Sequence, residues 1–157
     1  MRAGRVIDGR YRLLSKLGQG GMGEVWRGEH LGLGTPVAVK LLSPTVLDSK
    51  LALARFKREA QSAASLRSSN VVQILDYGVD AESPYIVMEL LVGETLSMRL
   101  GKHAPLAPRA AARILTQVGK AVAKAHALSI VHRDLKPDNI FLVRDGEEEV
   151  AKVLDFG

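Results

Sequence analysis

The sequence predicts an α+β fold in which a small antiparallel sheet with one helix precedes a mainly helical part. Short runs rich in β-branched and aromatic residues, separated by glycine-rich turns, occupy most of residues 11–91 and enclose one amphipathic stretch. Beyond Gly93, apolar residues instead recur at helical spacing. The chain therefore divides into two parts, residues 11–91 and 92–157.

Five strands and one helix are expected in the first part. The strands are residues 11–17, 24–30, 36–42, 71–77 and 85–91. The helix covers about residues 48–67, where apolar side chains recur at helical spacing between charged ones. These apolar side chains are Leu53, Phe56, Ala60, Ala63 and Ala64.

Two helices and a hairpin are expected in the second part. A short helix near residues 94–101 precedes a long one over about residues 107–128. The apolar stripe of the long helix consists of Ile114, Leu115, Val118, Val122 and Ala125. A hairpin of residues 139–143 and 150–154 turns at Asp145-Gly146, because Asp-Gly is a strong turn signal.

The composition leaves the kind of ligand open. The 157 residues are 46% hydrophobic, enough for a domain with a core, and carry a formal net charge of +5. Residues 1–75 hold 12 Lys and Arg against 5 Asp and Glu, which suits a polyphosphate ligand and equally a solvated surface or an acidic partner. Without cysteine, no disulfide or thiolate metal site is expected. We expect a soluble, cytoplasmic chain, since no stretch approaches the roughly 18 apolar residues that span a bilayer.

A glycine-rich segment separates the first two expected strands. Residues 18–25 read Gly-Gln-Gly-Gly-Met-Gly-Glu-Val and match G-x-G-x-x-G-x-V, in which missing side chains let backbone N–H groups approach phosphate oxygens. A dinucleotide fingerprint would open a helix here, whereas residues 24–28 favour a strand. The segment is expected to be a hairpin lid over phosphates, with an ordinary flexible hairpin as the alternative.

A lysine and a glutamate lie on the next two elements. Lys40 ends the apolar strand Val37-Ala38-Val39-Lys40, and Glu59 lies on the following helix. Taken singly, both side chains are most often just solvated. Held as an ion pair beside the glycine-rich segment, they would position the α- and β-phosphates of a nucleotide.

The motif with the most specific chemistry is residues 132–139, His-Arg-Asp-Leu-Lys-Pro-Asp-Asn. Asp134 is placed to orient a substrate hydroxyl, and Lys136 to neutralise charge on a transferring phosphoryl group. His132 is expected to be a buried, hydrogen-bonded scaffold residue, because phosphoryl transfer needs positioning and electrostatics more than a strong base.

Two further residues of this region suit a metal ion. Asn139 follows Asp134 by five positions, and Asp155 opens the triplet Asp-Phe-Gly at residues 155–157. Their side-chain oxygens are hard ligands of the kind that Mg²⁺ prefers. The sequence therefore predicts Asn139 and Asp155 as metal ligands.

Taken together and in this order, the segments resemble the eukaryotic-like protein kinase family over residues 11–157. Residues 20–26, Gly-Gly-Met-Gly-Glu-Val-Trp, are most similar to the bacterial Ser/Thr branch. Lys136 and Pro137 are also similar to Ser/Thr rather than Tyr kinases. The resemblance implies a protein-kinase-like fold with a complete N-lobe at 11–91, of a five-stranded antiparallel sheet and one helix, and the start of a C-lobe at 92–157.

The same resemblance implies ATP and Mg²⁺ as cofactors and Ser/Thr-containing proteins as substrates. The implied catalytic residues are Asp134, Lys136, Lys40 and Glu59, and the metal ligands Asn139 and Asp155. The implied nucleotide-binding residues are Leu17, Gly18, Gln19, Gly20, Gly21, Met22, Gly23, Glu24, Val25, Ala38, Lys40, Met88, Glu89, Leu91 and Phe141. Among them, Glu89 and Leu91 would bind adenine through their backbone, Met88 would stand behind it, and Val25, Ala38 and Phe141 would sandwich the ring.

The resemblance also carries departures. Ser68-Ser69-Asn70 stands where the family often has His-Pro-Asn, and the sequence ends at Gly157, before an activation segment. We therefore expect a partial domain that is inactive alone, in which Arg133 lacks its activation-loop partner. The apolar stripe of residues 107–128 is expected to face water and to favour self-association.

Three functions fit the sequence. The leading one is a protein Ser/Thr kinase. The alternative is a non-catalytic nucleotide-binding or interaction module, a truncated kinase-like pseudoenzyme. A small-molecule phosphotransferase is a weaker third reading, because such relatives usually lack Val-Ala-Val-Lys and Arg133 together. Neither a nucleic acid nor a membrane is expected as a partner.

Overall fold

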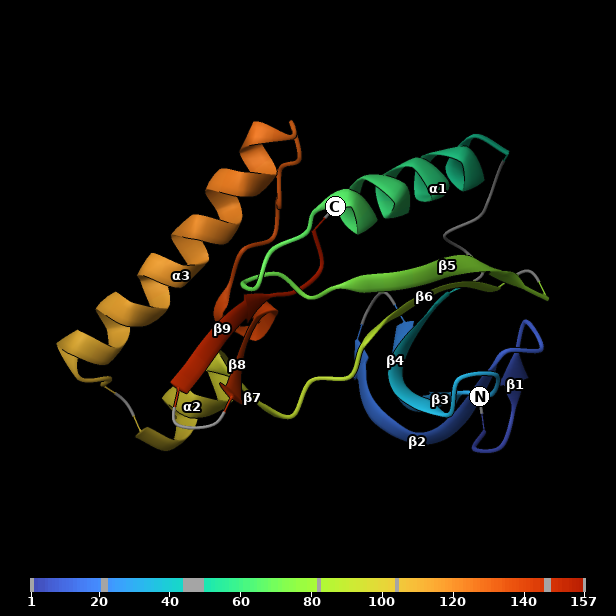
Figure 1. Ribbon diagram of the computed structural model, residues 1–157, viewed down its shortest axis with the longest axis horizontal. Coiled ribbons are helices and arrows are strands. Elements are labelled where there is room, and N and C mark those ends of the chain that lie inside the picture. Colours follow the sequence, from blue (N-terminus) through green and yellow to red (C-terminus); the bar gives the residue numbers. More distant parts are fainter. Residues whose placement is uncertain are drawn as a thin grey trace. The chain divides into compact units, whose positions relative to one another are not determined.

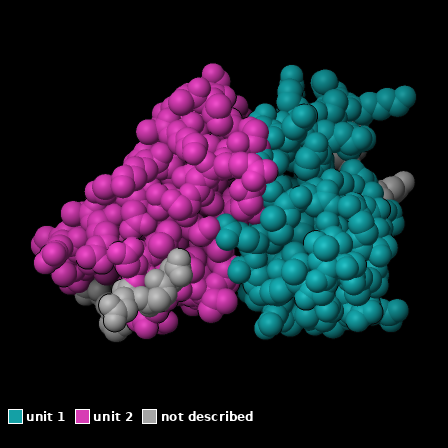
Figure 2. Space-filling model, in the orientation of Figure 1, with its two compact units in different colours: residues 1–64, 74–90 teal, residues 65–73, 91–157 magenta. Residues whose placement is uncertain are grey.

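The computed structural model describes residues 2–20, 23–43, 50–81, 83–103, 105–145 and 148–156. The chain forms two compact units (Figure 2). The first unit comprises residues 1–64 and 74–90, and the second comprises residues 65–73 and 91–157. Each unit has its own buried apolar core.

The first unit is built on a six-stranded sheet in which every neighbouring pair is antiparallel. The strands are β1 Val6–Ile7, β2 Tyr11–Gly20, β3 Gly23–His30, β4 Thr35–Leu42, β5 Ile74–Asp80 and β6 Ser83–Glu89, in the order β1-β2-β3-β4-β6-β5. Figure 1 shows β2, β3 and β4 as a strongly curled ribbon. The core of this unit includes Leu13, Trp26, Val39, Tyr85 and Val87.

The sheet has one strand more than the five expected. The additional strand, β1, is only two residues long, too short to show an alternating pattern. It is followed by a tight turn in which Asp8 and Gly9 have φ of 50° and 65° and the Arg10 N–H donates to the Ile7 carbonyl at 3.0 Å. Asp-Gly between apolar residues is a hairpin signal, so the dipeptide at 8–9 was the available clue.

One helix, α1 Lys50–Ser65, belongs almost entirely to this unit. The expected helix began at residue 48, which lies outside the described residues. Phe56, Ala60 and Ala63 are buried as their spacing predicts. The Phe56 ring meets Tyr77 of β5 edge-on at 6.5 Å, which fixes the face of the sheet on which α1 packs.

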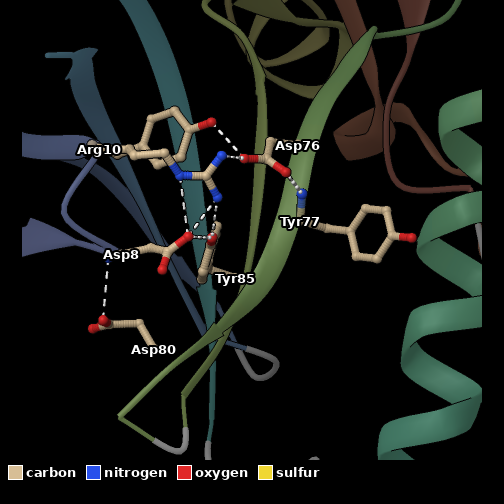
Figure 3. A network of polar contacts seen from close by, with 7 residues as sticks. Asp8, Arg10, Asp76, Tyr77, Asp80 and Tyr85 are labelled. Carbon is tan, nitrogen blue, oxygen red and sulfur yellow. Dashed lines mark hydrogen bonds and ion pairs between the residues drawn. The ribbon is translucent and has the colours of Figure 1, made fainter. Parts of the chain in front are cut away.

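Polar side chains join the two edges of this sheet (Figure 3). Arg5 lies 2.8 Å from Asp80 of β5, and Arg10 pairs with both Asp8 and Asp76. The hydroxyls of Tyr11 and Tyr85 donate to Asp76 at 2.6 Å and to Asp8 at 2.8 Å. We call these seven residues the edge network: Arg5, Asp8, Arg10, Tyr11, Asp76, Asp80 and Tyr85.

One member of the edge network, Tyr85, also belongs to the apolar core. Tyr85 is 1% exposed, and burial, together with its bond to Asp8, raises its pKa to about 12. Its ring lies across Gly78, where a Cβ would come within 2.6 Å of the hydroxyl oxygen. The network therefore closes the curled sheet with hydrogen bonds and ion pairs where no strand pairing is available.

The second unit combines helices with a three-stranded antiparallel sheet of order β7-β8-β9. Its elements are β7 Gly93–Thr95, α2 Leu96–His103, α3 Pro108–Ala127, the 3₁₀ turn η2 Pro137–Asn139, β8 Ile140–Asp145 and β9 Glu148–Val153. The helices and the hairpin lie where the sequence predicts them. The α+β class is confirmed.

The apolar stripe of α3 corrects two expectations. The expectation that this stripe faces water is wrong. The structure buries four residues of α3 in a cluster with residues of β8 and β9: Ile114, Val118, Ala121 and Ala125. Leu115, expected in the stripe, is 65% exposed. It lies about 100° around the helix from Ile114, whereas the buried positions are spaced four, three and four residues apart.

Residues 65–73 belong to the second unit through Asn70. Its side-chain amide donates to Gln117 of α3 at 2.9 Å and to the Ala151 carbonyl of β9 at 3.0 Å. The Asn70 carbonyl accepts from the Val153 N–H at 2.8 Å. Asn70 is 8% exposed, so it is a buried anchor for the loop in which the sequence departs from the family pattern.

In the part of the chain that the structure describes, the helices are too short or too polar to cross a membrane.

Replacing Tyr85 with Phe keeps the buried ring and removes its hydroxyl. We expect the free energy of unfolding to fall by about 2 kcal/mol. The hydroxyl loses the hydrogen bond that it donates to Asp8 and the longer one that it accepts from Arg10 at 3.3 Å, while Asp8 and Arg10 stay paired. Urea denaturation measures the change. Tyr77→Phe is the matched control, since among the described residues no partner of the Tyr77 hydroxyl is found. Equal effects of the two variants would contradict the role of the edge network.

The stability of the second unit should depend on pH through Glu94. Arg99 at 2.6 Å, and after it Lys102 at 2.9 Å, hold the pKa of Glu94 at about 2, below its ordinary 4.5. A lowered pKa means that the carboxylate stabilises the fold above pH 4.5 and that this contribution is lost as the pH falls toward 2. Glu94→Gln should lower the thermal midpoint at pH 6, and the gap to the parent should narrow toward pH 3. A constant gap, or the same profile for Glu148→Gln, would refute this.

Candidate functional site

The register of β4 gathers four predicted nucleotide-binding residues on one face of the first unit. Val25 of β3 lies opposite Lys40, and Met88 of β6 lies opposite Ala38. Directly opposed residues of antiparallel strands share a face, and so do residues two apart on one strand. Val25, Ala38, Lys40 and Met88 therefore project together, on the face opposite the core residue Val39.

The glycines of the loop between β2 and β3 differ in what they require. A Cβ at Gly23, where φ is 145°, would lie 2.0 Å from the Leu41 carbonyl oxygen, so the fold itself excludes a side chain there. Around Gly18 and Gly20 nothing lies within 4 Å of a Cβ. These two glycines leave open space of the kind that a phosphate group would use. Gly21 and Met22 lie outside the described residues.

The other predicted nucleotide-binding residues that the structure describes lie on strands or directly after one. Leu17, 54% exposed, and Gln19 lie near the end of β2, and Glu24 lies at the start of β3. Glu89 ends β6 opposite Val37. In the second unit, Leu91 follows that strand half-buried, and Phe141 lies on β8 opposite Thr95.

Both Lys40 and Glu59 are described, and no ion pair between these two residues is found. Lys40 has an interaction with another residue. Lys40 is half-buried on β4, and Glu59 is exposed on α1. The sequence predicts both elements, but the rotation of a helix about its axis is set by packing that no motif records.

Asp134 lies at the centre of a polar cluster in the second unit. The Lys136 ammonium donates to its Oδ2 at 2.7 Å. The Asn139 amide nitrogen donates to the Asp134 carbonyl at 2.8 Å and to Oδ2 at 3.2 Å. Lys136, and more weakly Asn139, lower the pKa of Asp134, so its carboxylate is ionised at neutral pH.

The His132 side chain holds the loop of Asp134 in place through two hydrogen bonds. It is 4% exposed. Its Nε2–H donates to the Leu154 carbonyl at 2.7 Å, and its Nδ1 accepts from the Asp134 N–H at 3.3 Å. Because both ring nitrogens are engaged, His132 has the scaffold role that its sequence context indicates and is not a general base.

The segment after β9 meets the same loop. The Leu154 N–H donates to the Asn139 carbonyl at 2.9 Å, and Phe156 packs edge-on against His132 at 4.8 Å. Asp155 follows with a φ of 52°, and Arg133 has a φ of 65°. Two residues other than glycine in this left-handed region, beside one cluster, mark a loop whose shape is dictated by more than local preference.

The donor set near Asn139 and Asp155 suits Mg²⁺. The Asn139 amide nitrogen faces Asp134, and no hydrogen bond among the described residues uses its side-chain oxygen. No three His, Cys, Asp or Glu side chains gather into a cage within the described ranges. Mg²⁺ is commonly held by one or two protein groups together with substrate phosphates, so two ligands fit it better than a larger protein cage would.

Comparison with known proteins identifies the fold family. A family model described as the protein kinase domain matches residues 11–157. The chain belongs to the protein kinase domain family. Serine/threonine-protein kinase Pkn1 of Myxococcus xanthus is 46% identical over 153 residues, which are 97% of this chain. PrkC of Bacillus subtilis, also named a serine/threonine-protein kinase, is 42% identical over 157 residues, 100% of this chain.

A solved structure agrees. The crystal structure of the Mycobacterium tuberculosis PknI kinase domain superposes with a TM-score of 0.87 at 28% identity. The matched region covers 99% of this chain and 62% of the PknI chain. The chain spans only 22% of the length of Pkn1 and 24% of that of PrkC.

Sequence reasoning did not find Lys16 or the contacts of Asn70. Lys16 lies on β2 and bonds to Glu24 across the hairpin, through a register that has two bulges. Motif matching assigns the glycines of this loop but not the charged side chains beside them. The Asn of the family's His-Pro-Asn pattern was the signal available for Asn70.

Replacing His132 with Leu should leave the Leu154 carbonyl and the Asp134 N–H without these partners in a partly buried setting. We expect the free energy of unfolding to fall by about 2 kcal/mol. Amide hydrogen exchange in residues 132–139 and 154–156 should accelerate. His126→Leu, at an exposed site near the end of α3, is the control. Unchanged exchange in both segments would exclude the scaffold role.

Proposed function

We propose that the protein containing this chain transfers the γ-phosphoryl group of ATP to Ser and Thr hydroxyls of proteins. The observation that carries the proposal is the cluster of Asp134, Lys136 and Asn139 on a loop fixed by His132. Membership of the protein kinase family and the serine/threonine-protein kinases among its relatives support it. Lys136, two residues beyond Asp134, supports the Ser/Thr class.

In this proposal, Asp134 orients the substrate hydroxyl and accepts its proton as the hydroxyl oxygen bonds to the γ-phosphorus. The bond between that phosphorus and the β–γ bridging oxygen breaks, and ADP leaves. The lowered pKa of Asp134 keeps this carboxylate ionised, and Lys136 stabilises charge on the phosphoryl oxygens. Asn139 and Asp155 would hold Mg²⁺, which supplies charge neutralisation for the phosphates when bound. These groups position and stabilise; no strong base is required.

The nucleotide would occupy the face that carries Val25, Ala38, Lys40 and Met88. Open space at Gly18 and Gly20 supports phosphate binding there. The backbone at Glu89 and Leu91 would bind adenine, and Phe141 is kept as a predicted contact of the ring. We assign residues 11–91 to the N-lobe and 92–157 to the start of the C-lobe, and place the protein in the cytoplasm, where ATP is available. Self-association remains a prediction, now without the buried α3 stripe as its basis.

A non-catalytic nucleotide-binding module is the second candidate. One observation favours it: Glu59, which would position Lys40 in phosphoryl transfer, is exposed on α1. A protein that binds nucleotide without aligning it would not need the pair. Binding and transfer must therefore be measured separately.

Asp134→Asn and Asp155→Asn should each reduce phosphoryl transfer at least about 100-fold, because positioning and charge stabilisation are lost in the transition state. Transfer of labelled phosphate from Mg-ATP to a generic basic protein measures this, alongside a nucleotide titration. Asp138→Asn, an exposed carboxylate on the same loop, is the control and should stay near the parent. Nucleotide binding without transfer in the parent would favour the second candidate. Undiminished transfer in the Asp155 variant would refute the metal assignment.

A further inference from the structure

A chain of polar contacts runs from the core of the first unit to Gln19, at the base of the turn in the glycine-rich hairpin. The Trp26 indole N–H donates to Glu24 Oε2 at 3.0 Å. The Lys16 ammonium donates to Glu24 Oε1 and to Gln19 Oε1, both at 2.7 Å. Trp26 is 6% exposed and belongs to the core, so the far end of this chain is fixed.

The contacts lie beside an irregular stretch of the pairing between β2 and β3, close to the turn at which this pairing ends. Gln19 pairs with Glu24 and Gly20 with Gly23, so the cluster lies at the base of the turn. Gly18 and Gly20 have no side chains that could hold the tip in place. The register also shifts between Lys16 and Gly18, which interrupts regular pairing on this side. The side-chain contacts therefore reinforce a backbone pairing that extends to Gly20 and Gly23 but is irregular between Lys16 and Gly18.

We infer that Lys16 and Glu24 are positioning residues that hold the glycine-rich loop in the shape that receives nucleotide phosphates. The inference rests on the proposed function, because it assigns a task to residues beside the same phosphate site. Gln19 and Trp26 extend the pair in either direction, so that Gln19, at the base of the turn, is linked to the core through three hydrogen bonds.

The pair also sets the charge beside the phosphates. Lys16, and after it Trp26, lower the pKa of Glu24, so this carboxylate is ionised at neutral pH. An unpaired carboxylate at this place would repel a triphosphate. Paired with Lys16, which is 36% exposed against 23% for Glu24, it contributes almost no net charge. Lys16 thus orders the loop and compensates the charge of its partner.

The test compares Lys16→Met, Glu24→Gln and the double variant with the parent. Two readouts are the Kd for Mg-ATP and amide hydrogen exchange over residues 11–30. Trp26 is the only tryptophan of the chain, so its fluorescence reports the loss of the Glu24 contact directly. Arg27→Met, exposed on β3, is the matched control, and Lys16→Arg should rescue binding.

Each single variant should raise the Kd about two- to fivefold, as expected for a partly exposed pair, and should accelerate exchange at residues 18–20 and 23–25. The double variant should be no worse than the weaker-binding single variant, because both act through one contact. Thermal midpoints should change little.

Two results would overturn the inference: unchanged exchange in both single variants, or tighter binding by Glu24→Gln without faster exchange, which would leave only a charge effect. Failure of the proposed function gives a different result. If the parent does not bind Mg-ATP, the proposed function fails. The exchange and fluorescence measurements still decide whether Lys16 and Glu24 order the loop.

Discussion

The alternation of side chains along β4 determines both the core and the candidate nucleotide face of the first unit. Val37, Val39 and Leu41 point into the core, so Ala38 and Lys40 must point out of the other side. A slip of one residue in the register would exchange the two sets, burying a lysine and exposing three apolar side chains. Stability and the candidate site therefore depend on the same hydrogen-bond register.

Both units use polar side chains to hold backbone segments outside regular strand pairing, but the contacts differ. In the first, the edge network and the contacts of Glu24 join strands at places where regular pairing ends. In the second, the buried His132 ring bonds to the carbonyl of Leu154, just after β9, and the buried Asn70 amide bonds to the carbonyl of Ala151 in β9, so each joins a loop to this part of the chain. In both, a few polar side chains with several partners each take over from repeated main-chain hydrogen bonds.

The sequence predicts what depends on local pattern. Helical periodicity places α1, α2 and α3 within about two residues, and the Asp-Gly signal places the β8–β9 hairpin. The short strand β1 carries too few residues for a pattern, and the exposure of Leu115 depends on which neighbours pack against α3. Closure of the sheet brings together residues more than 60 positions apart, which no local signal encodes.

The residues of the candidate site also differ in whether a local sequence pattern predicts them. The cluster around Asp134 lies within one short motif, so its members were named from sequence. The pairing of Lys40 with Glu59 requires a particular rotation of α1, and the motif fixes only that both residues exist. Residues that act by holding others, such as Lys16, carry no chemistry of their own and are visible only through their contacts.

The edge network also bears on where this domain starts. The family match begins at Tyr11, but Ile7 is fully buried in the core and Asp8 and Arg10 carry ion pairs of the network. A boundary drawn at the family match would remove a core side chain and leave Asp76 and Asp80 of β5 without their arginines. For this chain, the physical unit of folding extends at least six residues upstream of the unit that family comparison defines, to Arg5.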